Sequence, residues 1–530
     1  MIKDISLRVK PVVASSSDKV RDELLAYLGK EAKKLNDFRI IRRSIDARKS
    51  PVMINLLVRI ATGEDEKVES TFKPVEFKPV SEDAPVVIIV GAGPAGLFAG
   101  LEALRNGIRP IILERGRDVE RRRLDIANIS RQKRINPDSN YCFGEGGAGA
   151  YSDGKLYTRS KKRGSVEEVL QLLVQHGATP DILIDAHPHI GSDNLPNVIK
   201  AIRNTITENG GEVRFEARAD GLIMKEGRAV GVMTETGEVL GDAVVLATGH
   251  SAHDTFRAVY EAGVAVEPKG IAVGVRLEHP QKLIDRMQYH SHEGRGKYLP
   301  AAEYSFVAQA ADRGVYSFCM CPGGVIVPAG SSDHELVVNG MSASARAGKW
   351  ANSGMVVELH PGDLPELAAP GPLEMLEVQE ALERKMFEAA GNTIQAPAQR
   401  MKDFVDGKVS VDLPDSSYAP GLLAADFNKI FPGFISSRLR DGFNTFGRRA
   451  KGFLTNDAVM IGLESRTSSP VRITRDPVTL ESVSTPGLYP AGEGAGYAGG
   501  IVSAAIDGMR CIRAFADSIH VRHDNKKLEK

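Results

Sequence analysis

Residues 86–116 read VVIIVGAGPAGLFAGLEALRNGIRPIILERG, a pattern typical of one class of α/β fold. An uncharged apolar run leads directly into Gly91, Gly93 and Gly96, and a second apolar run ends at Glu114. In a strand–turn–helix–strand unit, the first glycine permits the tight turn, the second lets a pyrophosphate approach the backbone, and the third lets helix and strand pack closely. We therefore predict a Rossmann-type dinucleotide site in which the carboxylate at the end of the second strand accepts the ribose hydroxyls.

The helix that begins after this turn adds to the prediction. Its first N–H groups have no partner within the helix, and its dipole places positive charge at that end, so it attracts phosphates. The expected cofactor contacts in this unit are Gly91, Gly93, Pro94, Ala95, Gly96, Glu114 and Arg115.

Two later stretches favour FAD over NAD. Residues 488–508, LYPAGEGAGYAGGIVSAAIDG, resemble the C-terminal flavin-binding signature of glutathione-reductase-type flavoproteins. In that signature an acid after a strand binds the ribityl chain and the next helix points its N-terminus at the flavin; the acid here is glutamate where aspartate is usual. The turn VVLATGH, residues 244–250, resembles the second crossing of the chain beside FAD. The resemblance implies contacts from Thr248, Gly249, Gly492, Glu493, Gly500 and Ile501.

A glycine-rich loop at residues 144–156, GEGGAGAYSDGKL, also fits GxGxxG. The preceding NPDSNYCF is not a buried strand, so we do not interpret the loop as a second nucleotide fold. In related flavoproteins such a loop runs along the pyrophosphate and the flavin, which adds Gly146, Gly147 and Asp153 to the expected contacts. Because no other strand–GxGxxG–helix unit occurs, we predict no dedicated NAD(P)H domain. Transient docking of NAD(P)H or another electron partner stays open.

The motifs resemble one family in particular, that of the uncharacterised FAD-dependent dehydrogenases. The similar stretches spread over most of residues 85–515, and they are GEGGAGAYSDGKL, AHPHIGSDNLP, RLEHPQ, YSFCMCPGG, LESRTSSPVRITRD and YAGGIVSAAIDG. The resemblance implies a glutathione-reductase-type FAD fold and redox chemistry, and it implies no particular substrate.

Four residues are candidates for catalysis. Cys319 and Cys321 are too close for common zinc-ligand spacing and lack a second pair, so we expect no metal. They form either a redox dithiol beside the flavin or two small buried side chains. His189 is a candidate flavin donor or acid–base group. Arg466 either grips a substrate carboxylate or phosphate, or belongs to a structural loop whose arginines pair with nearby acids.

Composition narrows the class of protein. The chain has 530 residues, with 68 basic and 68 acidic side chains, and 42% of its residues are hydrophobic, as in a globular protein. No apolar run suits a membrane span, and the N-terminus lacks the apolar core of a signal peptide, so we expect a cytoplasmic protein without a membrane partner. Residues 1–80 carry 17 basic and 12 acidic side chains, and residues 115–134 carry eight and three. We interpret this charge as solvated surface; nucleic acid is the weaker alternative, because no stacking aromatics accompany it.

The predicted fold class is α/β. It consists of an α+β (βαββ) module with a linker at 1–80, an FAD-binding domain in two parts at 85–265 and 445–520, an inserted β-rich substrate domain at 266–444, and a tail at 521–530. The predicted function is an FAD-dependent oxidoreductase that transfers hydride between flavin N5 and an unidentified small organic substrate. The alternatives are a tRNA-modifying flavoprotein and a non-catalytic flavin-binding scaffold or sensor.

Overall fold

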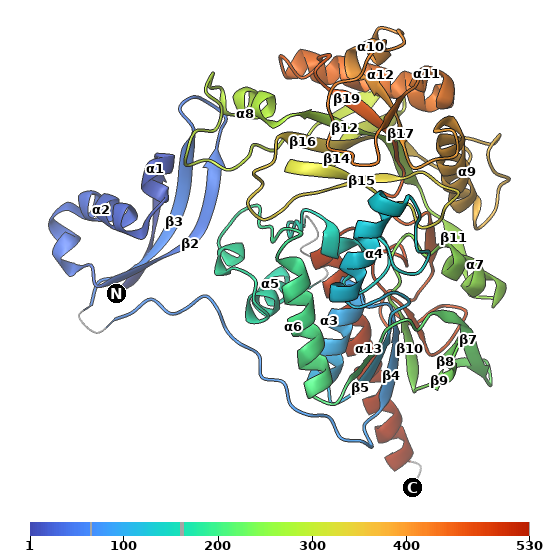
Figure 1. The fold of residues 1–530 in the computed structure, drawn as a ribbon. Helices are drawn as coiled ribbons and strands as arrows, with labels where there is room; N and C mark the ends of the chain where they lie inside the picture. Colours follow the sequence, from blue (N-terminus) through green and yellow to red (C-terminus); the bar gives the residue numbers. More distant parts are fainter. Residues whose placement is uncertain (64–65, 159–163, 529–530) are drawn as a thin grey trace.

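A parallel sheet lies in the lower part of the main body in Figure 1, which shows the computed structural model; the structure describes residues 1–63, 66–158 and 164–528. Its strand order is β21-β10-β4-β5-β6, and all four pairings are parallel. The strands are β4 (Val86–Val90), β5 (Arg109–Leu113), β6 (Glu212–Arg214), β10 (Ala243–Leu246) and β21 (Leu488–Pro490). Strands far apart in the sequence therefore end at one edge, as expected of a sheet that binds a dinucleotide there.

The two faces of this sheet explain why β4 is apolar throughout. Successive side chains of a strand point to opposite faces. Val87 and Ile89 pack with the helices on one face, and Ile88 and Val90 pack with the layer on the other face. The helices are α3 (Pro94–Arg105), α5 (Val166–Gln175), α6 (Leu195–Glu208) and α13 (Ile501–Leu528). The other layer comprises β7 (Ala219–Lys225), β8 (Arg228–Thr234), β9 (Gly237–Leu240) and α7 (His253–Glu261).

A second, larger sheet has the order β13-β14-β16-β12-β19-β17-β18, with β15 paired to β14. We call it the antiparallel sheet, because all its pairings except that of β17 with β18 are antiparallel. Its strands are β12 (Ile271–Pro280), β13 (Val307–Ala310), β14 (Arg313–Pro328), β15 (Val338–Met341), β16 (Trp350–Leu359), β17 (Ala396–Arg400), β18 (Leu422–Ala424) and β19 (Val459–Glu464). It packs with α8 (Gln281–Tyr289), α9 (Glu374–Ala389), α10 (Met401–Val405), α11 (Phe427–Ile430) and α12 (Gly433–Arg449). Since β19 pairs with β12 and β17, this sheet continues past the boundary expected at residue 444.

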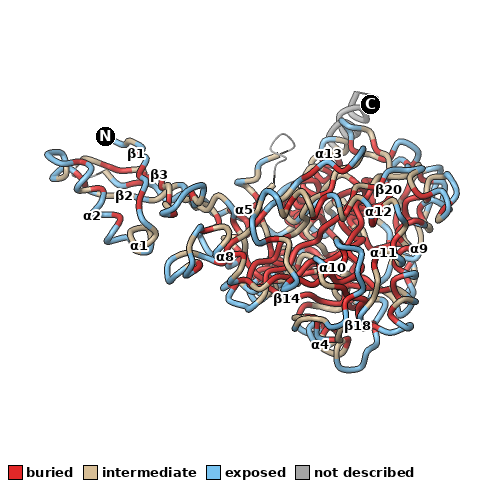
Figure 2. The backbone as a smooth tube through the Cα atoms, turned by 90° about the horizontal axis from the view of Figure 1, so that it is seen from above, coloured by how far each residue is buried: buried red, intermediate tan, exposed pale blue. Residues whose placement is uncertain are grey.

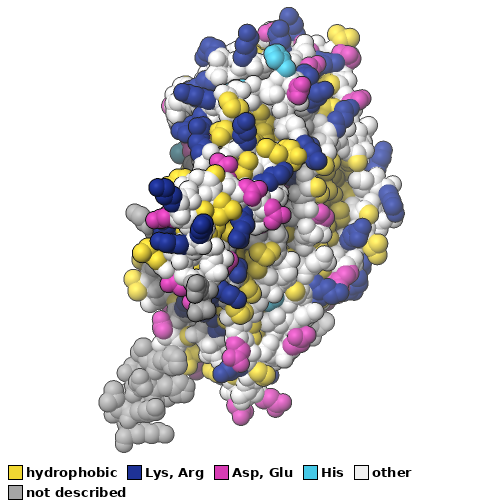
Figure 3. Space-filling model, turned by 90° about the vertical axis from the view of Figure 1, so that its left-hand side faces the viewer, with side chains coloured by type: hydrophobic (Ala, Val, Ile, Leu, Met, Phe, Trp, Pro, Cys, Tyr) yellow, Lys and Arg dark blue, Asp and Glu magenta, His cyan; other side chains and the backbone are white. Residues whose placement is uncertain are grey.

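The N-terminal segment forms a sheet of its own, in the order β1-β3-β2. Its elements are β1 (Ile2–Val9), α1 (Pro11–Ala14), α2 (Ser17–Leu28), η1 (Gly29–Lys34), β2 (Asp37–Asp46) and β3 (Met53–Ala61). Arg43 joins it to the main body: its guanidinium contacts Asp185 at 2.6 Å and Asp181 at 3.2 Å, and its backbone N–H donates to the Ile184 carbonyl at 2.8 Å. Figure 2 shows this segment apart from the main body, where most of the buried backbone lies. On the face that carries it, Lys and Arg side chains are interspersed with Asp and Glu (Figure 3).

The remaining elements connect these parts: α4 (Val119–Gln132), η2 (Gly147–Tyr151), η3 (Pro180–Leu183), and the pair β11 (Val266–Pro268) and β20 (Val471–Ile473). The expected tail at 521–530 differs from the structure, because α13 continues to Leu528; residues 529–530 lie outside the described part. Among the described residues, no helix is both long and apolar enough to cross a membrane.

Candidate active site

A cavity of about 570 Å³ opens between the parallel sheet and the antiparallel sheet. The end of β4, the loop at 144–155 and the start of α13 line it on one side, and β14 and β15 reach it from the other. Fifteen of the residues expected from the sequence line this cavity: Gly91, Gly93, Pro94, Ala95, Glu114, Arg115, Gly147, Asp153, Thr248, Gly249, Cys319, Arg466, Glu493, Gly500 and Ile501. Five lie outside the lining: Gly96, Gly146, Gly492, Cys321 and His189.

The glycine turn after β4 is shaped by close backbone contacts. Gly91 has φ +106°, and a Cβ there would lie 2.8 Å from the Ala247 carbonyl oxygen. A Cβ on Gly96 would lie 1.9 Å from the Gly91 carbonyl oxygen. Gly93 is different, since its Cβ would meet only the Gly147 Cα at 4.0 Å. Gly91 and Gly96 thus allow the turn to close, whereas Gly93 leaves space beside the N-terminus of α3, which no side chain caps.

Glu114 ties the turn to the neighbouring loop. Its buried carboxylate accepts the N–H groups of Ala92, Gly116 and Gly144, each at 2.9 Å. Two carboxylate oxygens offer about four acceptor positions, so three bonds leave capacity for a further donor. The expected ribose contact at Glu114 stays a prediction. Its neighbour Arg115 pairs with Asp138 at 2.8 Å and with Asp254 at 2.9 Å.

Arg122 lies outside the cavity lining but positions a loop that forms it, a role that the sequence did not reveal. It lies in the basic run 115–134, which we expected to be solvated, yet its side chain is fully buried. Its guanidinium donates five hydrogen bonds of 2.8 to 3.1 Å to the carbonyls of Asn140, Tyr141, Gly144, Glu145 and Gly147. It therefore holds the loop whose Gly144 and Gly147 line the cavity. Charge alone could not reveal this, because Arg121 and Arg123 on the same helix are exposed.

The 144–155 loop also contacts the antiparallel sheet region. Asp153 is buried and pairs with Arg346, whose Nε lies 2.9 Å from the carboxylate, and Arg346 Nη1 contacts Glu303 at 2.9 Å. Lys155 Nζ donates to the Met320 carbonyl. Gly146 faces away from the cavity, because a Cβ there would meet Ile199 Cδ1 at 2.4 Å.

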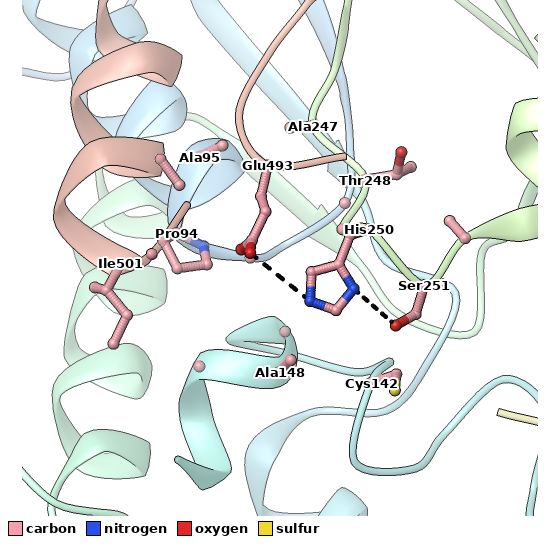
Figure 4. A pocket seen from close by; sticks show the side chains of 18 of the residues that line it. Pro94, Ala95, Cys142, Ala148, Ala247, Thr248, His250, Ser251, Glu493 and Ile501 are labelled. Atoms are coloured by element: carbon pink, nitrogen blue, oxygen red, sulfur yellow. Dashed lines mark hydrogen bonds and ion pairs between the residues drawn. The ribbon is translucent and has the colours of Figure 1, made fainter. Parts of the chain in front are cut away.

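On the wall formed by the segments that follow β10 and β21, His250 and Glu493 point toward one another (Figure 4). His250 Nε2 lies 3.7 Å from Glu493 Oε1, and its Nδ1 lies 3.1 Å from Ser251 Oγ. Burial raises the pKa of Glu493 to about 7, and burial together with nearby cations lowers the pKa of His250 to about 3. Gly492 lies behind Glu493 and donates its N–H to Asp507 at 2.8 Å. The wall therefore holds a neutral imidazole and a carboxyl group that titrates near neutrality.

We expect Glu493→Gln to stabilise the FAD-free protein at pH 8 and to leave its stability nearly unchanged at pH 5. Because the pKa of Glu493 is raised from 4.5 to about 7 in the folded protein, the stability associated with its neutral form is full below about pH 4.5 and is lost as the pH rises through about 7. The difference at pH 8 should be roughly 1–3 kcal/mol, allowing for partial solvent exposure. Denaturant unfolding of both proteins at both pH values measures it. A difference that does not change with pH would contradict the shifted pKa.

Arg466 lines the cavity but is already paired. Its Nη2 lies 2.6 Å from Glu335 and 2.9 Å from Glu383, and its Nη1 donates to Ser331 Oγ at 2.9 Å. Arg475, farther along the same stretch, pairs with Asp507 at 2.6 Å. These contacts match the structural alternative for this loop, and we do not find a free guanidinium at Arg466 for a substrate anion.

The other catalytic candidates are separated. His189 lies outside the cavity lining, and its Nε2 is 3.0 Å from the Ser344 carbonyl oxygen. Cys319 lines the cavity, and Cys321 is buried directly behind it.

Cys142 and Asn339 also line the cavity and were not singled out as site residues. Only their packing in three dimensions reveals them, because neither belongs to a motif.

The cavity fits FAD on its own features. The uncapped start of α3 beside the open space at Gly93 suits a pyrophosphate, and the start of α13 at Ile501 provides a second helix N-terminus at the cavity. A Cβ on Gly249, Gly499 or Gly500 would meet no atom within 4 Å, so the backbone is open to a ligand there as well. Within the described residues, no cluster of side chains suits a metal ion.

Comparisons with known proteins agree with this fit. Residues 270–467 match the family described as FAD-dependent protein, C-terminal domain-like, residues 83–128 match an FAD binding domain, and residues 1–61 match a domain of unknown function. The fold and these matches define a flavoprotein whose cofactor is FAD. An uncharacterized protein of Clostridium beijerinckii is 39% identical over 513 residues, which are 92% of this chain and 95% of that protein. The chain belongs to this family of FAD-dependent proteins.

Other similar proteins match a smaller part of this chain or have a lower sequence identity to it. The protein FixC of Salmonella typhi is 25% identical over 238 residues, which are 41% of this chain and 48% of FixC. The crystal structure of CtdE in complex with FAD has a TM-score of 0.33 and 12% identity, and covers 82% of this chain and 84% of that chain. At this TM-score the likeness says nothing about the site.

Proposed function

We propose that the protein is an FAD-dependent oxidoreductase that transfers hydride between flavin N5 and a small organic substrate. The observation that carries the proposal is the shared cavity: the predicted FAD contacts of the parallel-sheet region and Phe318, Cys319 and Asn339 of the antiparallel-sheet region line the same space. When bound, FAD supplies the two-electron chemistry, while the protein positions it and sets the electrostatics.

The chain divides these tasks between its two sheets. Gly93 and the first turn of α3 would receive the pyrophosphate, Glu114 the ribose, and Glu493 the ribityl chain. We propose that the two-part FAD-binding region and the inserted substrate region expected from the sequence meet at the cavity. In this proposal the inserted region ends after β19, and the second part of the FAD-binding region begins there. Glu493, with a pKa near neutrality beside the neutral His250, is the group best suited to hold or release a proton there.

The test uses the FAD-loaded protein without oxygen. Members of separate compound classes, including hydroxy acids, amines, unsaturated acids and reduced nicotinamides, are mixed with it in turn, and the absorbance of oxidised or reduced flavin is followed. We expect one class to change the flavin's redox state at a rate that saturates with concentration. Equal rates with every compound, matching those of free FAD, would favour the scaffold or sensor alternative instead.

A further inference from the structure

We propose that Cys319 and Cys321 form a dithiol–disulfide couple that exchanges two electrons with the bound FAD. This inference deepens the proposed function, because it adds a second redox centre to the same cavity. It rests on where the two sulfurs lie, on the arginine behind them and on the local distortion of β14.

The two cysteines occupy an irregular part of β14. Phe318 pairs with Gly354 and Cys321 pairs with Asn352, so three steps along β14 match two steps along β16. A bulge of this kind re-aims side chains and is frequent next to active sites. Cys319 has φ +43°, in the left-handed region that side chains disfavour. The distortion lets Cys319 line the cavity while Cys321 stays buried behind it.

A fully buried arginine supports the pair from behind. Arg276 Nη2 donates to Cys321 Sγ at 3.2 Å and to the Cys319 carbonyl at 2.6 Å. Its Nη1 contacts Glu464 at 3.1 Å, which fixes the guanidinium in this position. A cation beside the sulfurs stabilises a thiolate and so makes a cysteine reactive.

The two thiols differ in acidity. The hydrogen bond from Cys321, followed by the charges of Arg276 and Lys155, lowers the pKa of Cys319, although burial and Asp153 oppose the shift. The same hydrogen bond, burial and the negative charge of Cys319 raise the pKa of Cys321. The cavity-facing thiol is therefore the more acidic of the two, and the buried thiol holds its proton more tightly. The other carboxyl groups near the pair, Glu464 and Glu493, have raised pKa values of about 7.

The exchange balances with FAD as the other reactant. In the oxidation of the pair, the two S–H groups lose two electrons and two protons and one S–S bond forms between Cys319 and Cys321. Both electrons and one proton pass to oxidised FAD, and the second proton passes to solvent. The reverse direction breaks the S–S bond and returns both thiols. The couple therefore stores two electrons in addition to the two stored by the flavin.

Counting electrons tests the proposal without any substrate. The FAD-loaded protein is fully reduced with dithionite under anaerobic conditions, freed of excess reductant, and titrated with ferricyanide while flavin absorbance is followed. We expect the wild-type protein to release four electrons per FAD, and Cys319→Ser and Cys321→Ser to release two each. Cys511→Ala is the matched control: Cys511 is buried outside the cavity lining, so this variant should still release four.

Mass spectrometry of the oxidised wild-type protein provides a second readout that needs no variant. We expect the peptide that contains both cysteines to be lighter by two hydrogen atoms and to regain them after reduction. Release of only two electrons by the wild-type protein, with both thiols free in the oxidised state, would overturn the proposal. That result would leave the flavin's reaction with a substrate untouched, whereas a four-electron count with no reactive substrate class would overturn the proposed function alone.

Discussion

Gly93→Val is expected to abolish FAD binding while the protein still folds. Gly93 is the N-cap of α3 and lines the cavity, and its Cβ would approach only the Gly147 Cα, at 4.0 Å. The valine side chain would therefore occupy open space at the helix N-terminus, where a phosphate must approach the backbone. We expect the dissociation constant for FAD to rise at least about 100-fold, which is roughly 3 kcal/mol. Flavin absorbance of the purified protein and calorimetric titration with FAD measure the loss.

A glycine elsewhere gives the matched control. Gly221 lies in β7, outside the cavity lining, and a Cβ there would meet no atom within 4 Å. Gly221→Val should bind FAD like the wild-type protein, and the FAD-free forms of all three proteins should unfold at similar temperatures. If Gly93→Val binds FAD within a few-fold of the wild-type affinity, the phosphate does not approach this turn.

The sequence predicts those parts of the site that depend on residues close together in the chain. The glycine turn after β4 and the Glu493–Ile501 segment have patterns imposed by tight turns and helix starts, and the structure brings both to one cavity. The resemblance to FAD-dependent proteins is confirmed by the two matched FAD family models. Whether each expected residue touches FAD stays a prediction that the substitutions test.

Interactions between distant segments could not be predicted in the same way. Arg466 is 83 residues from Glu383 and 131 from Glu335, and the sequence could not decide between a substrate anion and these carboxylates as its partners. β19 lies past residue 444, where the sequence predicts the end of the inserted region, and it is as apolar and buried as a strand of the parallel sheet. Strand pairing, which depends on partners elsewhere in the chain, is what assigns β19 to the antiparallel sheet.

Arg122→Leu should destabilise the protein and weaken FAD binding together. The leucine removes five hydrogen bonds, so the carbonyls between residues 140 and 147 lose the guanidinium as their donor while they stay buried. An unsatisfied buried acceptor costs about 1–3 kcal/mol, so even after the loop relaxes we expect a loss of at least about 3 kcal/mol. The affinity for FAD should fall as well, because Gly144 and Gly147 of this loop line the cavity. Denaturant unfolding of the FAD-free protein and FAD titration give the two values.

The neighbouring arginine separates this role from helix charge. Arg123 lies on the same helix but is exposed, so Arg123→Leu removes the same charge without removing a loop contact. Its effect on stability should stay within about 0.5 kcal/mol, as for ordinary surface substitutions. Arg122→Lys keeps the charge but offers one ammonium group in place of the planar guanidinium, so it should fall between the wild-type protein and Arg122→Leu. Equal effects of the leucine substitutions at positions 122 and 123 would mean that the loop is held by its own backbone contacts, and that Arg122 is not required for the shape of the FAD cavity.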